Sequence, residues 1–115
     1  FPHWFCDNYK KYGADVQGLP FDQHELIAMI APRPVYVASA SLDDWADQKG
    51  EMLALVNASP VYRLYGYEGF HAEELPPVNT PMVTDRMGYH MREGKHNIVL
   101  YDWQQYVSFA DNYLK

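Results

Sequence analysis

The chemically most informative residues of this sequence are acids that follow one apolar stretch and a histidine that follows another. Asp43 and Asp44 come directly after residues 35–40, and His96 follows residues 86–92. In open α/β sheets, catalytic side chains gather where the parallel strands end. A carboxylate beside an imidazole there would fix its tautomer and orientation, which is the relation that a nucleophilic hydrolase requires between its acid and its base. We therefore predict that Asp43 pairs with His96.

Simpler interpretations stand beside this pairing. Asp44 competes with Asp43 for the role of the acid, and either carboxylate would also suit the N-terminus of a following helix. On the residue pattern alone, a solvent-facing turn residue is the better interpretation of His96. Trp45, at the same acidic rim, would either stack on a sugar ring or close the core.

The other histidines do not form a recognisable metal-binding pattern. His71, His90 and His96 are accompanied by no cysteine or carboxylate motif of the kind that holds zinc, so no metal site is expected. His90 lies inside a predicted strand, where a hydrogen-bonded structural role is the better interpretation.

The sequence lacks the nucleophile that an acid and a base would serve. No Gly-x-Ser-x-Gly motif is present, and the serines lack the glycines that a sharp strand-to-helix turn needs. Hydrolases of this fold place the serine before the acid and the histidine along the chain. Residues 1–115 are therefore interpreted as a single portion, the C-terminal one, of a larger catalytic domain.

The elements that would position these residues alternate between strand and helix. Residues 35–40 are apolar or small without polar alternation, as in a parallel strand covered on both faces, and residues 86–92 are a second strand candidate. Each is followed by a predicted helix. We expect the last two strands of a parallel sheet in a three-layer αβα fold, with an exposed strand edge that could pair with a second copy.

Local signals predict where two of the helices begin. Asp22 opens one by a capping-box pattern, and Asp47 is the expected N-cap of another over residues 48–58. Residues 59–66 suit either a helix or an extended connection.

Residues 66–85 are predicted to form a long irregular loop. Residues 101–115 are the clearest helix, with Asp102 as its expected cap. The apolar stripe expected on that helix comprises Trp103, Tyr106, Val107, Ala110 and Leu114.

Composition excludes several function classes. The net charge is −6 with nine lysines and arginines and no basic cluster, which disfavours binding to nucleic acid. No apolar run reaches the length of a membrane span. Cys6 is alone and is expected to be a small buried hydrophobe, and residues 1–12 are expected to pack their aromatic rings.

Several motifs in one order resemble the C-terminal part of bacterial glucuronoyl esterases, carbohydrate esterase family 15, whose relatives are often labelled acetyl xylan esterases. The motifs are Phe-Pro-His-Trp-Phe-Cys-Asp-Asn-Tyr at residues 1–9, Leu-Pro-Phe-Asp-Gln-His-Glu-Leu at 19–26, Ile-Ala-Pro-Arg-Pro at 30–34, Trp-Ala-Asp-x-Lys-Gly-Glu at 45–51, Gly-Tyr-His at 88–90, Gly-Lys-His at 94–96 and Asp-Trp at 102–103. The resemblance covers nearly the whole chain.

The resemblance implies a serine esterase of the α/β-hydrolase fold that needs no cofactor. It would cleave glucuronoyl or acetyl esters of xylan, including links between xylan and lignin. By position, His96 would be the general base, Asp43 the acid, and Trp45 would face the sugar. The serine, with its neighbouring arginine, would lie in the missing N-terminal part, and the enzyme would be secreted or periplasmic. The alternative is an inactive carbohydrate-binding or interaction domain.

Overall fold

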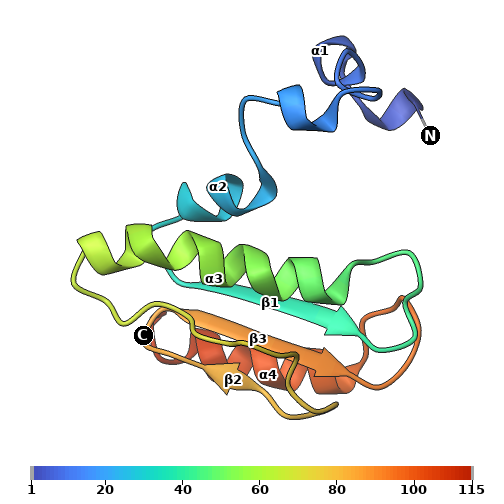
Figure 1. Ribbon diagram of the computed structural model, residues 1–115. Helices are drawn as coiled ribbons and strands as arrows, with labels where there is room; N and C mark the ends of the chain where they lie inside the picture. Colours follow the sequence, from blue (N-terminus) through green and yellow to red (C-terminus); the bar gives the residue numbers. More distant parts are fainter. Residues whose placement is uncertain (1, 115) are drawn as a thin grey trace.

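The computed structural model describes residues 2–114 and contains a three-stranded sheet. Its two long strands, β1 (Val35–Ala40) and β3 (Met87–Arg92), pair in parallel and point the same way in Figure 1. The short strand β2 (Met82–Val83) runs antiparallel along the other side of β3. The two predicted strands are confirmed. The end of the predicted loop adds the antiparallel strand β2, which was not expected.

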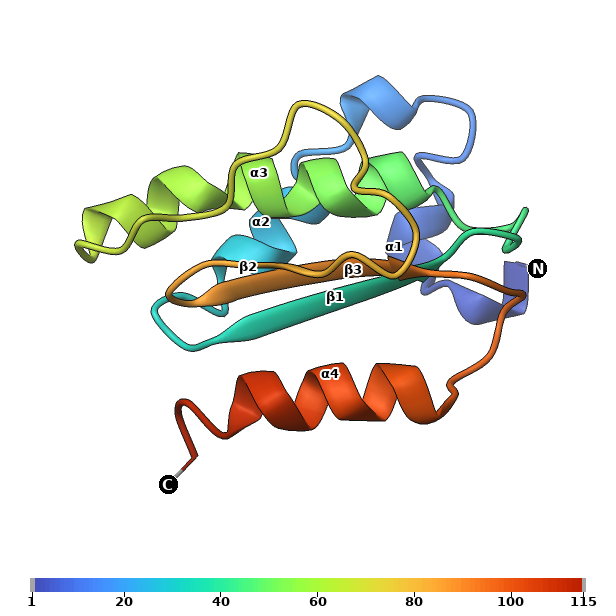
Figure 2. The ribbon, with the colours of Figure 1, turned by 90° about the horizontal axis from the view of Figure 1, so that it is seen from below.

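Helices cover both faces of the sheet. Helix α3 (Gln48–Leu64) lies on one face, and α4 (Leu100–Ala110) lies on the opposite face (Figure 2). The short helix α2 (Gln23–Ala28) packs against α3. Its N-cap is Asp22, as predicted, whose carboxylate accepts a hydrogen bond of 2.7 Å from the backbone N–H of Gln23. The predicted three-layer arrangement, with a helix after each parallel strand, is confirmed.

Helix α3 is longer than its local signals indicated. Asp47 caps it as predicted, accepting a hydrogen bond of 2.9 Å from the N–H of Gly50. The helix continues through Pro60 to Leu64, so most of the ambiguous stretch is helical. Proline removes one hydrogen bond from a helix. The burial of neighbouring side chains such as Tyr62, which is fully buried, compensates for that loss.

Helix α4 differs from its prediction at both ends. Its N-cap is Val99, and Asp102 lies in the first turn, where its carboxylate accepts a hydrogen bond of 2.7 Å from the N–H of Val99. Asp102 therefore caps the start of the helix as predicted, but from the third helical position, with Val99 as the N-cap residue. The helix ends at Ala110, and the predicted last residue, Lys115, lies outside the described residues.

The face that α4 turns towards the sheet also differs from the predicted stripe. Trp103 and Val107 are more than half exposed, whereas Asp102 and Phe109 are buried. The apolar pattern predicted the wrong face of the helix because the buried face includes Asp102, and an aspartate is not counted as a core residue in such a pattern.

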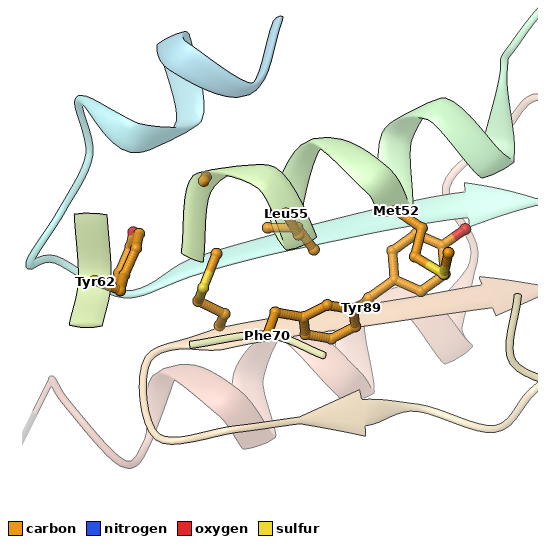
Figure 3. Close-up of a cluster of buried hydrophobic side chains, with 7 residues drawn as sticks. Met52, Leu55, Tyr62, Phe70 and Tyr89 are labelled. Atoms are coloured by element: carbon orange, nitrogen blue, oxygen red, sulfur yellow. The ribbon is translucent and has the colours of Figure 1, made fainter. Parts of the chain in front are cut away.

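The main core lies between α3 and the sheet (Figure 3). The five labelled side chains, which are almost completely buried, are Met52, Leu55, Tyr62, Phe70 and Tyr89. Phe70 comes from the connection after α3, and its backbone N–H donates a hydrogen bond of 2.6 Å to the hydroxyl of Ser59. This contact holds the irregular connection against the helix.

Residues 2–22 project away from the sheet (Figure 1). They contain the short helical segments η1 (Pro2–Trp4), α1 (Asp7–Lys10) and η2 (Val16–Gly18), none of which holds a buried residue. Trp4 is 68% exposed and Cys6 is also exposed, so the prediction of a buried cysteine is wrong. The aromatic rings do pack on one another as expected, because Phe5 stacks on Tyr9 with ring centroids 5.0 Å apart. None of the described helices is both long and apolar enough to cross a membrane.

Candidate active site

Asp43 and His96 lie in contact. A distance of 2.6 Å separates Oδ2 of Asp43 from Nδ1 of His96. An ionised carboxylate can only accept, so a neutral imidazole facing it would carry its proton on Nδ1 and leave a lone pair on Nε2. The side chain of Asp43 is 9% exposed and that of His96 is 89% exposed. The arrangement therefore offers a buried acid behind an accessible proton acceptor.

The parallel pairing of β1 and β3 brings these two residues together. Both strands end at the same edge of the sheet, so the segments that follow them meet there (Figure 1). Beyond the last paired residues, the N–H of Ser41 donates to the carbonyl of Arg92 and the N–H of Leu42 to that of Gly94, both at 2.9 Å. Gly94 has a φ of +121°, a conformation that favours glycine.

Gln48 holds the acid-bearing loop from the first turn of α3. Its side-chain amide donates hydrogen bonds of 2.9 Å to the carbonyls of Ala40 and Asp43. The sequence interpretation missed this residue, because a glutamine at a helix start has no distinctive signal. Its amide fixes the backbone on both sides of the turn that carries Asp43.

The structure distinguishes the two candidate acids by position. Asp44 is exposed, whereas the buried Asp43 contacts His96. Trp45 is 87% exposed, so of the two interpretations offered for it, closure of the core is wrong. Its role towards a sugar stays a prediction.

Two hollows lie on this part of the chain. One of about 570 Å³ adjoins the acid and the histidine. Its lining includes Asp43, His96, Ser39, Glu51 and Tyr106. A larger one of about 720 Å³ lies between α2 and α3 and contains none of the predicted site residues. The smaller hollow is therefore the one relevant to chemistry.

Beneath the site, the sequence interpretation missed a buried polar cluster. Oδ1 of Asp102 lies 2.8 Å from Nε2 of His90, and its Oδ2 accepts a hydrogen bond of 2.8 Å from Nε of Arg92. The hydroxyl of Tyr36 lies 3.0 Å from the other ring nitrogen of His90. His90 is thus the hydrogen-bonded strand residue that was predicted. The sequence did contain a signal for this cluster. His90 and Arg92 are two positions apart in a predicted strand, so both side chains lie on the same face of the sheet.

Electrostatics in this cluster favour a charged Asp102. Burial by itself would raise the pKa of Asp102, but hydrogen bonds from Val99, His90 and Arg92 outweigh it and hold that pKa below its usual range. Burial raises the pKa of Tyr36 far above its usual value. The Tyr36 hydroxyl therefore keeps its proton and can donate a hydrogen bond to Nδ1 of His90.

The histidines do not converge on a common point. His90 and His96 contact different carboxylates, and His71 is exposed on the connection after α3. Among residues 2–114, no group of three or more histidine, cysteine, aspartate or glutamate side chains is arranged to hold a metal ion.

Comparison with known proteins identifies relatives of the whole chain. A family model described as glucuronyl esterase from fungi matches residues 2–66. Carbohydrate esterase MZ0003, from an unknown prokaryotic organism, is 46% identical over 99% of this chain. A solved glucuronoyl esterase from Solibacter usitatus superimposes on 96% of the chain with a TM-score of 0.88 at 50% identity, and one from Teredinibacter turnerae superimposes on 98% with a TM-score of 0.88 at 34% identity.

The chain is much shorter than these proteins. It spans 26% of the curated relative, 28% of the Solibacter chain and 27% of the Teredinibacter chain. The solved relative from Teredinibacter is a member of carbohydrate esterase family 15, and the family model covers more than half of the present sequence. The chain therefore belongs to the glucuronyl esterases, carbohydrate esterase family 15, and has the architecture of their α/β-hydrolase fold.

Proposed function

We propose that this chain is the C-terminal portion of a serine carboxylic ester hydrolase, to which it supplies the base His96 and the acid Asp43. The observation that carries the proposal is the contact of 2.6 Å between Oδ2 of Asp43 and Nδ1 of His96. It occurs in a chain whose family is named for cleavage of glucuronoyl esters. The nucleophilic serine would come from a preceding part of the protein.

The proposed reaction uses the two nitrogens of His96 differently. Nε2 takes the proton from the serine hydroxyl as its oxygen attacks the ester carbonyl, while Asp43 stabilises the resulting imidazolium through Nδ1. The tetrahedral intermediate collapses to an acyl-enzyme, and His96 returns the proton to the departing alcohol. A water then attacks the acyl carbon, giving up a proton to Nε2, and the acid and the free serine are released.

The proposed substrate is a glucuronoyl ester on xylan, with acetyl esters as a second possibility. Curated relatives include the 4-O-methyl-glucuronoyl methylesterase 1 of Wolfiporia cocos, 32% identical over 68 residues. Trp45 supports a sugar substrate, because its indole is 87% exposed two residues after the acid. A flat aromatic surface in that place can stack on a pyranose ring. Because the proposed substrate is a cell-wall polymer, the enzyme would be secreted or periplasmic. The proposed triad uses only side chains and water, so it would require no cofactor.

The test is hydrolysis of a methyl ester of glucuronic acid by the complete protein and its His96→Ala variant. Loss of the base is expected to lower kcat by about 10³-fold or more. The matched control is His71→Ala, which removes an exposed histidine from another loop and should leave kcat unchanged. Normal turnover by His96→Ala would refute the assigned base, and an inactive wild-type protein would refute the proposed activity.

A second candidate function is an inactive carbohydrate-binding or interaction domain. The exposed Trp45 supports it, because sugar stacking does not require a nucleophile. Within residues 2–114, β1 also has one side without a partner strand, where the rest of the protein or a second copy could pair. Saturable binding of xylan oligosaccharides by a complete protein that hydrolyses no ester would favour this candidate.

A further inference from the structure

We propose that Arg92 and Asp102 form a buried clamp that positions the turn carrying His96. The proposal rests on the function assigned to His96 above. It makes the two residues positioning residues, because their polar atoms bond to each other and to the turn, while both line the hollow beside His96. The clamp is defined here as the guanidinium of Arg92, the carboxylate of Asp102 and the hydrogen bonds that they make.

The first observation concerns the carbonyls around His96. Nη1 of Arg92 donates to the carbonyl of Glu93 at 3.0 Å, and its Nη2 donates to the carbonyl of Lys95 at 2.8 Å and also to that of Asn97. Lys95 and Asn97 are the immediate neighbours of His96 in the chain. One side chain thus holds the backbone on both sides of the proposed base.

The second observation concerns what holds Arg92. Its Nε donates to Oδ2 of Asp102 at 2.8 Å, and the same oxygen accepts the N–H of Val99 at 2.7 Å. Oδ1 of Asp102 lies 2.8 Å from Nε2 of His90. The carboxylate therefore ties together the end of β3, the far end of the turn and the first turn of α4. Arg92 and Asp102 are 3% and 2% exposed.

Geometry around His96 makes such a clamp necessary. The His96 side chain is 89% exposed, so packing contributes little to its orientation. Its ring position depends on the backbone of residues 93–97 and on the contact with Asp43. A Cβ added at Gly94 would lie 2.8 Å from Nη1 of Arg92, so the turn also passes close to the guanidinium.

The planar guanidinium fits this task in a way that an ammonium does not. Arginine presents five donors in a fixed fork, whereas lysine presents a single charged point on a flexible chain. Arg92 uses three of its nitrogens here, one towards the carboxylate and two towards the turn. Arg92→Lys would preserve the charge beside Asp102 but could not hold the carbonyls on both sides of His96.

The experiment compares wild-type and Arg92→Lys versions of the complete protein by two independent measurements. The first is the kinetics of methyl glucuronate hydrolysis. A displacement of the base by about 1 Å is expected to lower kcat by about 10²-fold, with KM nearly unchanged. The second is the low-field NMR signal of the His96 Nδ1–H, assigned by its loss in His96→Ala. We expect this signal to broaden or disappear in Arg92→Lys while the protein stays folded.

The control separates positioning from stability. Phe70→Leu weakens the core on the α3 side of the sheet, remote from the turn, and should leave both kcat and the Nδ1–H signal unchanged at a temperature where it is folded. If Arg92→Lys fails to fold, Asp102→Asn is the second variant. It keeps the shape of the carboxylate but weakens its bond to Arg92, so a smaller change in the same direction is expected.

The outcomes are distinguishable from failure of the proposed function. A folded Arg92→Lys protein with wild-type kcat and an unchanged Nδ1–H signal would overturn the clamp, as would equal losses in Phe70→Leu. If the wild-type protein hydrolyses no ester, the proposed function fails. The NMR signal would still report whether Arg92 positions His96.

Discussion

Replacing Asp43 by asparagine removes a charge from the site with little change in shape. In the proposed mechanism, an imidazolium forms on His96 opposite this carboxylate, with Nδ1 and Oδ2 2.6 Å apart. Two unit charges about 4 Å apart attract by about 4 kcal/mol at an effective dielectric constant of 20 and by about 1 kcal/mol in water. Asp43 is buried and His96 is exposed, so the strength of their attraction lies between these two values. Asp43→Asn is therefore expected to remove transition-state stabilisation on the order of 2 kcal/mol, or about 30-fold in kcat.

The amide introduces a second defect. Its NH₂ group can turn towards Nδ1 and donate, which would stabilise the tautomer whose Nε2 carries the proton and cannot act as a base. With this effect the loss can reach about 10⁴-fold, the size measured for the corresponding change in a serine protease triad. We therefore expect Asp43→Asn to lower kcat by between about 30-fold and about 10⁴-fold.

The assay is steady-state hydrolysis of methyl glucuronate by the complete protein. The matched control is Asp44→Asn, which removes the same charge from an exposed neighbour on the same loop and should change kcat by less than about twofold. An Asp43→Asn protein with wild-type kcat would refute the reasoning and would indicate that the acid lies elsewhere in the protein. Equal losses in both variants would point to a general effect of loop charge.

Three further predictions concern the sugar, the core and the buried acid. Trp45→Ala is expected to raise KM by about 2- to 10-fold with little change in kcat, because stacking contributes about 0.5–1.5 kcal/mol; an unchanged KM in steady-state kinetics would argue against it. Phe70→Ala, at a site that is 1% exposed, should lower the free energy of unfolding by about 3–5 kcal/mol in urea titrations. The pKa of Asp102 is held below its usual range by its three donors despite burial, so its stabilisation is complete above about pH 4 and is lost as the pH falls through the lowered value. Urea titrations of Asp102→Asn should therefore show a lower stability at neutral pH and a shallower loss on acidification than those of the wild type.

Much of the fold could be predicted because its signals are local. The apolar run of β1, the caps Asp22 and Asp47, and the helices after each strand follow from residues close together in the chain. The pairing of Asp43 with His96 needed one more step, the rule that parallel neighbours end at the same edge. Where two strands are parallel and adjacent, the topology itself brings distant residues together.

Errors arose where the local pattern and the tertiary environment disagree. The helix predicted over residues 48–58 continues through Pro60 to Leu64, because its buried face is worth more than one hydrogen bond. Cys6 has a small apolar side chain, yet it is exposed, because the short helical segments among residues 2–22 bury none of their residues. Hydropathy describes a residue's preference, and burial depends on what lies opposite.

By itself, the sequence determined the two parallel strands with the helix that follows each, the family resemblance, and the two candidate residues His96 and Asp43. Only the tertiary structure decided that Asp43 and not Asp44 meets the imidazole, and that Asp102 bonds to Arg92 and His90 as well as to the start of α4. The reason is physical. Helix and strand preferences act between residues a few positions apart, whereas a hydrogen bond between side chains from different elements exists only after the sheet and the helices have packed.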